Sequence, residues 1–141
     1  MKIYNLPFIV LLFAGNIESS DEPLILSCKF KEIETEFPET YDVPQYKNSK
    51  SLVINTTKNV VEYLDDYNEP RPFEERGNKI FWQDKLTITP GEKGQTDYWN
   101  NNLDRITGEY VLRHSTIFEG RSFATIWFTQ KFECKKVDKL F

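Results

Sequence analysis

The sequence predicts an all-β domain, an antiparallel meander closed or nearly closed into an up-and-down β-barrel of about 7–8 strands. Two observations carry this prediction. Within short runs, apolar and polar residues alternate, and stretches rich in turn-forming residues separate these runs. One cysteine, Cys28, lies in the first of these runs and the other, Cys134, lies in the last. A two-sheet β-sandwich is the alternative, because it uses the same kind of strand.

The first twenty residues have the pattern of a secretory signal peptide. Lys2 precedes an apolar run that ends at Gly15, and polar residues follow as far as Asp21. The run is shorter than the ~20 apolar residues that span a bilayer. We therefore expect residues 1–20 to be a signal peptide and residues 21–141 to be a single β-domain, periplasmic or extracellular, with no membrane insertion after cleavage. A buried N-terminal helix is the alternative.

The first and last predicted strands both place a cysteine on their apolar face. Leu24, Leu26 and Cys28 share one face of the first strand, whose other face is polar except at Ile25. Phe128, Phe132 and Cys134 share one face of the last strand, interrupted only by Gln130. Because alternate residues of a strand share a face, the two thiols can meet across neighbouring strands. We expect a disulfide, which an exporting compartment would maintain. Closing so long a loop is worth about 4–5 kcal/mol in the chain-entropy model.

Further alternating segments lie between these two strands and read as hairpins. Gly108 suits a tight turn because glycine tolerates positive φ. We expect loops at 34–50, 65–78 and 90–100, where proline or glycine interrupts the alternation. The expected strand pairs are Ser51–Asn55 with Val60–Leu64, Lys79–Trp82 with Lys85–Thr89, and Leu103–Ile106 with Glu109–Arg113.

Several short motifs resemble a family of uncharacterised small exported bacterial proteins. The motifs are Leu26-Ser27-Cys28, the run Arg105-Ile106-Thr107-Gly108, and Cys134 shortly before the terminal Leu140-Phe141. The family pattern is a signal peptide, an early cysteine, an R-x-T-G hairpin and a late cysteine before Leu-Phe. The resemblance implies an exported protein with a disulfide. It implies no activity.

The charge and the reactive residues argue against most chemistries. A formal net charge of −4 with no basic stripe predicts no nucleic-acid partner. His114 is the single histidine, and Ser115 beside it would point to the opposite face, so no triad is expected and His114 should be exposed at a strand end. The acidic groups at 32–39 and 65–75 should be solvated loops. We expect no catalytic residue, metal or cofactor.

Arg105 is a candidate ligand contact. With Thr107 and Gly108 as a two-residue turn, Arg105 would face Tyr110 across the hairpin, on the face that carries Leu103. A guanidinium beside an aromatic ring could plug one end of the barrel or anchor an acidic ligand group at its mouth.

Three further aromatic residues are candidates for a binding surface. Phe123 and Trp127 lie on the face opposite Ile126 and Phe128, so they should point outward. Trp99 lies in the expected loop at 90–100. Exposed aromatic side chains that gather together can mark a binding surface. The proline-containing loops could equally cover them.

We therefore expect an exported, non-enzymatic β-domain that binds a small molecule or a protein partner. One alternative is a periplasmic hydrolase inhibitor that uses the loop at 65–78. A small carboxylate-dependent hydrolase or isomerase is a second alternative, and it requires an acidic group buried beside Arg105. A structural envelope protein is the third. The candidate ligand contacts are Arg105, Tyr110, Trp127, Phe123 and Trp99.

Overall fold

The computed structural model describes residues 22–65, 69–88 and 94–137, and these residues form one antiparallel sheet of nine strands. The predicted signal peptide lies outside the described residues. Two short helical segments, α1 (Pro38–Tyr41) and η2 (Pro44–Tyr46), join the first two strands. The strands are β1 (Leu24–Glu34), β2 (Lys50–Asn55), β3 (Val60–Tyr63), β4 (Arg71–Pro72), β5 (Glu74–Arg76), β6 (Lys79–Ile88), β7 (Gln95–Asp104), β8 (Glu109–Phe118) and β9 (Thr125–Lys136).

The order of the strands nearly closes the sheet into a barrel. That order is β4-β3-β2-β1-β9-β8-β7-β6-β5, so the first long strand lies beside the last, and the two edge strands are neighbours in sequence. β4 also lies against β6. The predicted all-β meander barrel is confirmed. Its strands number nine instead of seven or eight, because the very short β4 and β5 lie in the segment 65–78 that was expected to be a loop.

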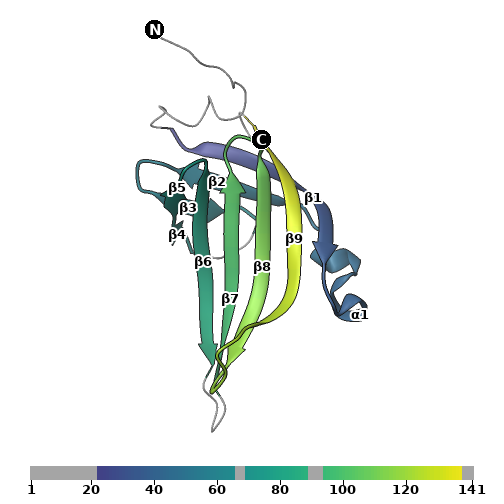
Figure 1. Cartoon of the computed structure of the whole chain (residues 1–141). Coiled ribbons are helices and arrows are strands. Elements are labelled where there is room, and N and C mark those ends of the chain that lie inside the picture. Colours follow the sequence, from purple (N-terminus) through teal and green to yellow (C-terminus); the bar gives the residue numbers. More distant parts are fainter. Residues whose placement is uncertain (1–21, 66–68, 89–93, 138–141) are drawn as a thin grey trace.

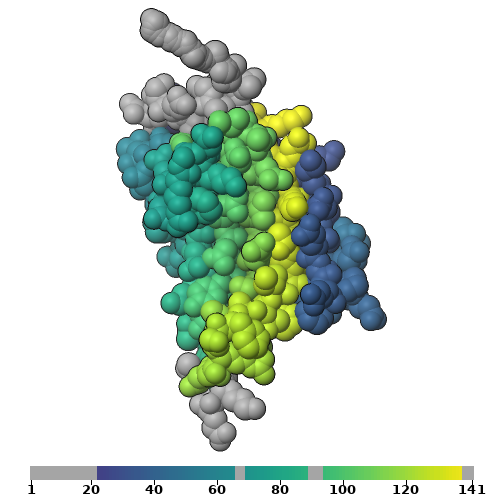
Figure 2. Space-filling view, in the orientation of Figure 1, coloured from purple at the N-terminus to yellow at the C-terminus, as the bar shows by residue number. Residues whose placement is uncertain are grey.

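The two halves of the barrel differ in length. Strands β6 to β9 run most of the height of the molecule, whereas β2 to β5 gather toward one end, with α1 beside β1 (Figure 1). In the space-filling view β6 to β9 form one continuous wall, and β1 continues it beyond β9 (Figure 2). Among the described residues, none of the helices is long and apolar enough to cross a membrane.

The predicted disulfide is present. Cys28 and Cys134 are directly opposite each other in the β1–β9 ladder, both are buried, and they are bonded across a sequence separation of 106 residues. The first and last strands are therefore joined twice, by the hydrogen-bond ladder and by a covalent bond.

Inward-facing alternate residues of the strands fill the end of the barrel that carries the disulfide. Ile80 and Trp82 are both buried there. Tyr110 stacks between Trp82 and Phe132, with ring centroids 5.5 and 5.1 Å apart. The fully or almost fully buried apolar residues are Leu26, Cys28, Leu52, Ile54, Val61, Ile80, Leu103, Tyr110 and Phe132.

Two of the three predicted hairpins are confirmed, and one prediction is wrong. β2 pairs with β3, and β7 pairs with β8 around Gly108. Residues 79–89 were expected to fold back on themselves, but β6 is one strand that pairs with β7 along its whole length. β7 begins at Gln95, inside the segment 90–100 that was expected to be a loop. Polar residues occupy both faces of this part of β7, so its alternation is not visible in the sequence.

A β-bulge changes the direction of side chains near the start of β9. His114 is opposite Phe128 and Ser115 is opposite Ile126, which leaves Trp127 as an extra residue. Ile126, expected to face inward, is 49% exposed. Trp127, expected to point outward, is partly buried instead and donates from Nε1 to Thr116 Oγ1 at 2.7 Å. The prediction for these two residues is wrong, because a bulge reverses the alternation on one side of it.

Candidate functional site

A cleft of about 500 Å³ opens into the barrel between the short strands and β6. The side chains around it come from η2 and from β2, β3, β4, β6, β7, β8 and β9, so nearly the whole barrel contributes. Its lining residues are Tyr46, Lys50, Tyr63, Arg71, Asp84, Lys85, Leu86, Trp99, Leu112, Phe128 and Gln130.

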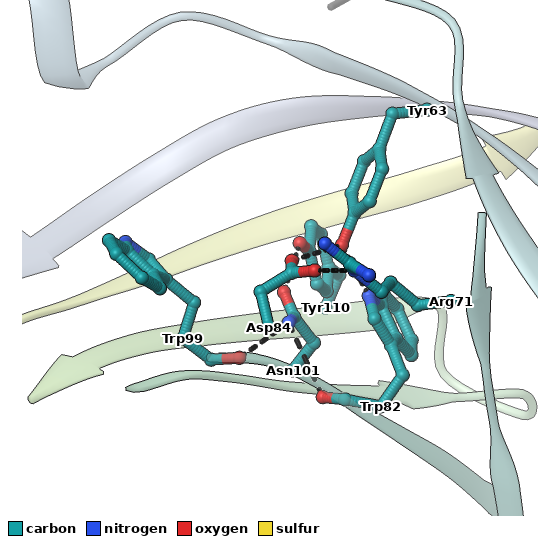
Figure 3. A network of polar contacts seen from close by, with 7 residues as sticks. All are labelled: Tyr63, Arg71, Trp82, Asp84, Trp99, Asn101 and Tyr110. Atoms are coloured by element: carbon teal, nitrogen blue, oxygen red, sulfur yellow. Dashed lines mark hydrogen bonds and ion pairs between the residues drawn. The ribbon is translucent and has the colours of Figure 1, made fainter. Parts of the chain in front are cut away.

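One wall of the cleft is a polar network around Asp84, which Figure 3 shows. The Asp84 carboxylate pairs with Arg71 Nε and accepts a hydrogen bond from Tyr63 Oη at 3.1 Å. Tyr63 Oη in turn accepts a hydrogen bond from Trp82 Nε1 at 2.6 Å. Because Tyr63 and Arg71 belong to β3 and β4 while Asp84 belongs to β6, the network joins the two sides of the barrel where the sheet itself does not close.

A second polar group, Asn101, supports the floor beneath this network (Figure 3). Its Nδ2 donates to the carbonyls of Trp99 and Trp82 at 3.0 and 3.3 Å. Its Oδ1 accepts from Tyr110 Oη at 2.6 Å. Asn101 and Tyr110 are both buried. A buried amide is stable here because its donor and acceptor sides both have partners.

A second wall of the cleft is aromatic and begins beside Asp84, whose partner in the β6–β7 ladder is Trp99. The Trp99 ring stacks on His114 with centroids 4.6 Å apart and an angle of 4° between the planes. Phe128 packs edge-on against His114 at 5.4 Å and also contacts Tyr41 and Tyr46, at 5.0 and 5.6 Å. Gln130 fixes this group from β9 by donating to the Tyr46 carbonyl at 2.6 Å. The result is an ordered aromatic surface along one side of the cleft.

His114 lies behind this aromatic wall and is not an exposed strand-end residue, so that expectation is wrong. Its side chain is 17% exposed, in the middle of β8. Burial lowers the pKa of His114, and the nearby Asp97 carboxylate acts in the opposite direction to a smaller extent. His114 Nε2 is buried, lies 3.8 Å from Asp97 Oδ1, and has no hydrogen-bond partner among the described residues. The arrangement favours the neutral imidazole as a packing group.

Lys50 is the unusual residue of the cleft. It begins β2 opposite Cys28, on the face that carries Leu52 and Ile54, so its side chain points into the barrel. Its Nζ lies 5.9 Å from the centroid of the Phe132 ring. None of the ion pairs formed by the described residues includes Lys50.

Arg105 lies away from the cleft, at the end of the barrel. Leu103, not Arg105, is opposite Tyr110, so the predicted pairing is wrong. The turn is longer than expected, since Gly108 N donates to Asp104 O. Arg105 donates from Nη1 to Glu75 Oε2 at 2.6 Å and from Nη2 to the Gly77 carbonyl at 2.8 Å. It therefore ties the β5–β6 turn to the β7–β8 turn.

The other four candidate contacts occupy different places. Trp99 lines the cleft. Tyr110 is buried in the core below it. Phe123 is 61% exposed, as expected, and lies near the guanidinium of Arg121. Trp127 packs against Phe37, with ring centroids 5.3 Å apart. The structure does not bring these candidates together.

The sequence analysis did not identify most of the residues that line the cleft, although two of them are charged residues on the apolar face of a strand. Lys50 shares its strand face with Leu52 and Ile54, and Asp84 shares its face with Ile80 and Trp82. A charge on the apolar face of a strand needs a partner or a ligand. Tyr46 and Arg71 gave no such signal, because they lie in segments that read as loops.

Comparisons of the chain with protein families, with characterised proteins and with solved structures find no match. The resemblance to exported bacterial proteins therefore stays a prediction. Within 22–65, 69–88 and 94–137, histidine, cysteine, aspartate and glutamate side chains form no group of three that could hold a metal ion.

Proposed function

We propose that this protein is a non-enzymatic binding domain that holds a small organic molecule in the cleft of the barrel. One observation carries the proposal: the gap in the barrel opens onto a cleft of about 500 Å³ with an aromatic wall. Cavities of roughly 300–1,000 Å³ that combine aromatic and aliphatic side chains with fixed polar groups are typical of small-molecule sites.

The groups around the cleft favour binding over catalysis. Asp84 is paired with Arg71 and accepts from Tyr63. Gln130 is held by the Tyr46 carbonyl. Polar groups that are already engaged in fixed contacts can orient a ligand without a large entropic cost, but they are poorly placed to transfer a proton.

Among the described residues, the hydrolase alternative lacks the feature it requires. It calls for an acidic group buried beside Arg105. The carboxylate that pairs with Arg105 belongs to Glu75, whose side chain is 54% exposed. An exposed pair of this kind suits a structural tie at the end of the barrel.

We also propose that the domain works outside the cytoplasm. The disulfide between Cys28 and Cys134 supports this location, because such bonds persist in oxidising compartments. The signal-like pattern of residues 1–20 supports it independently.

The binding proposal is tested with N-phenyl-1-naphthylamine, an uncharged aromatic probe whose fluorescence increases in apolar surroundings. The folded protein should bind this probe saturably. Trp99→Ala should weaken binding at least severalfold, because a stacking surface of the cleft is lost. Phe123→Ala is the matched control, since it removes an aromatic ring from the outer surface and should leave the affinity unchanged.

A second variant, Leu86→Trp, keeps the proposal testable if Trp99→Ala does not fold. Leu86 lines the cleft but is half exposed, so Leu86→Trp should fold and should fill part of the cleft. It should also weaken probe binding. Binding that is absent in the wild-type protein, or that falls with Phe123→Ala and not with the cleft variants, contradicts the proposal.

A further inference from the structure

We propose that the cleft is selective for small organic anions, with Lys50 as the counter-ion of an acidic group on a ligand that has a flat apolar body. This inference rests on the proposed function and adds the chemical class of the ligand. It starts from the charges that face the cleft.

Among the described residues, the positively charged side chains of the cleft are not all paired with carboxylates. Arg71 is compensated by Asp84. Lys85 is exposed, and its Nζ lies 6.0 Å from the centroid of Tyr98, its partner on β7. Lys50 is partly buried, and none of the described carboxylates pairs with it. Counted over the residues that the structure describes, the interior of the cleft therefore carries one positive charge in excess.

A charge in this position is costly unless something offsets the lost hydration. The Phe132 ring beneath Lys50 Nζ offsets part of it, since the face of an aromatic ring attracts a cation. That contact uses one side of the ammonium group and leaves N–H donors for a ligand. A carboxylate or sulfonate would complete the environment with a charge-assisted hydrogen bond.

The rest of the lining specifies the body of the ligand. Trp99 and Phe128 present aromatic surface, and Leu86 and Leu112 add aliphatic surface. Asp84, held by Arg71 and Tyr63, would repel a second acidic group on the ligand. These features together favour a molecule with one acidic group over a polyanion.

The test compares two probes that share one ring system. 8-Anilinonaphthalene-1-sulfonate carries a sulfonate, and N-phenyl-1-naphthylamine does not. The wild-type protein should bind the sulfonate probe about tenfold more tightly or better, the ratio expected for a charge-assisted hydrogen bond. Lys50→Met, which removes the charge and keeps a flexible side chain of similar length, should abolish this preference, so that the two probes bind with about equal affinity.

Lys29→Met is the matched control. Lys29 lies on β1 next to Cys28, is exposed on the outer face, and should not affect the preference. Equal affinity for both probes in the wild-type protein overturns the inference. So does an equal loss of both probes in Lys50→Met, which would assign Lys50 a purely structural role over Phe132. If the neutral probe does not bind at all, the proposed function fails together with the inference. Equal affinity for the two probes overturns the inference alone, so the two failures are distinguishable.

Discussion

Gly108 offers a sharp test of how the barrel is held together. Its φ is +80°, in the left-handed region, and a Cβ built on it would lie 2.6 Å from the carbonyl oxygen of Cys134. The same two residues are also hydrogen bonded, since Cys134 N donates to Gly108 O at 2.8 Å. The β7–β8 turn thus packs tightly against the backbone of the disulfide-bonded end of β9.

The cost of Gly108→Ala has two parts. Placing alanine in the left-handed region costs roughly 1–2 kcal/mol. The contact with Cys134 O involves backbone, which cannot rotate away, and forced shifts of this kind cost typically 1–3 kcal/mol more. Gly120→Ala isolates the first part, because Gly120 has φ +84° and nothing lies within 4 Å of its built Cβ.

The assay is urea unfolding of the oxidised protein, followed by tryptophan fluorescence and analysed with a shared m-value. Gly108→Ala should lose about 2–5 kcal/mol of unfolding free energy, the sum of the two parts. Gly120→Ala should lose about 1–2 kcal/mol, the conformational part alone. Equal losses in the two variants would refute the argument that close approach to Cys134 matters.

Three further predictions concern stability. Cys28→Ala with Cys134→Ala should lower the unfolding free energy by about 4–5 kcal/mol, measured by urea unfolding, because the denatured chain gains the entropy of a loop of 106 residues; an unchanged midpoint would contradict this. Tyr110→Phe leaves the buried Asn101 Oδ1 without its donor and should cost about 1–3 kcal/mol in the same assay. Burial lowers the pKa of His114, so the unfolded chain takes up its proton first as pH falls below about 6.5, and stability present above that pH is lost as pH falls through the folded pKa. His114→Phe should be less sensitive to acid than the wild-type protein when unfolding is compared at pH 7.5 and 5.5, and parallel losses in the two proteins would contradict this.

The sequence predicts the disulfide-bonded end of the barrel well because the alternation of apolar and polar residues is clear there. Leu26, Cys28 and Phe132 alternate with polar residues, so the inward face of β1 and β9 can be read directly. The same parity places the two cysteines on one side of the sheet and predicts their bond.

The cleft end could not be predicted in the same way. β7 carries Asp97 and Asn101 on its inward face, where Asn101 serves as a buried hydrogen-bonding hub, so this strand resembles a polar loop. The bulge at Trp127 reverses the alternation that was used to assign outward residues. Tertiary contacts decide both features, and they leave no local pattern. The cleft is hard to predict from the sequence because its polar groups face inward.

The pairing of β1 with β9 has a mechanical consequence. Leu26 is opposite Lys136, so the two strands enter and leave the barrel side by side. A force pulling Leu24 and Lys136 apart would break the residue pairs of this ladder one after another. The separation would stop at the disulfide between Cys28 and Cys134. Tension would then pass through the sulfur atoms, and residues 29–133 would carry no load. The oxidised domain is therefore a short, almost inextensible link, whereas the reduced domain would unravel along its whole length under the same pull.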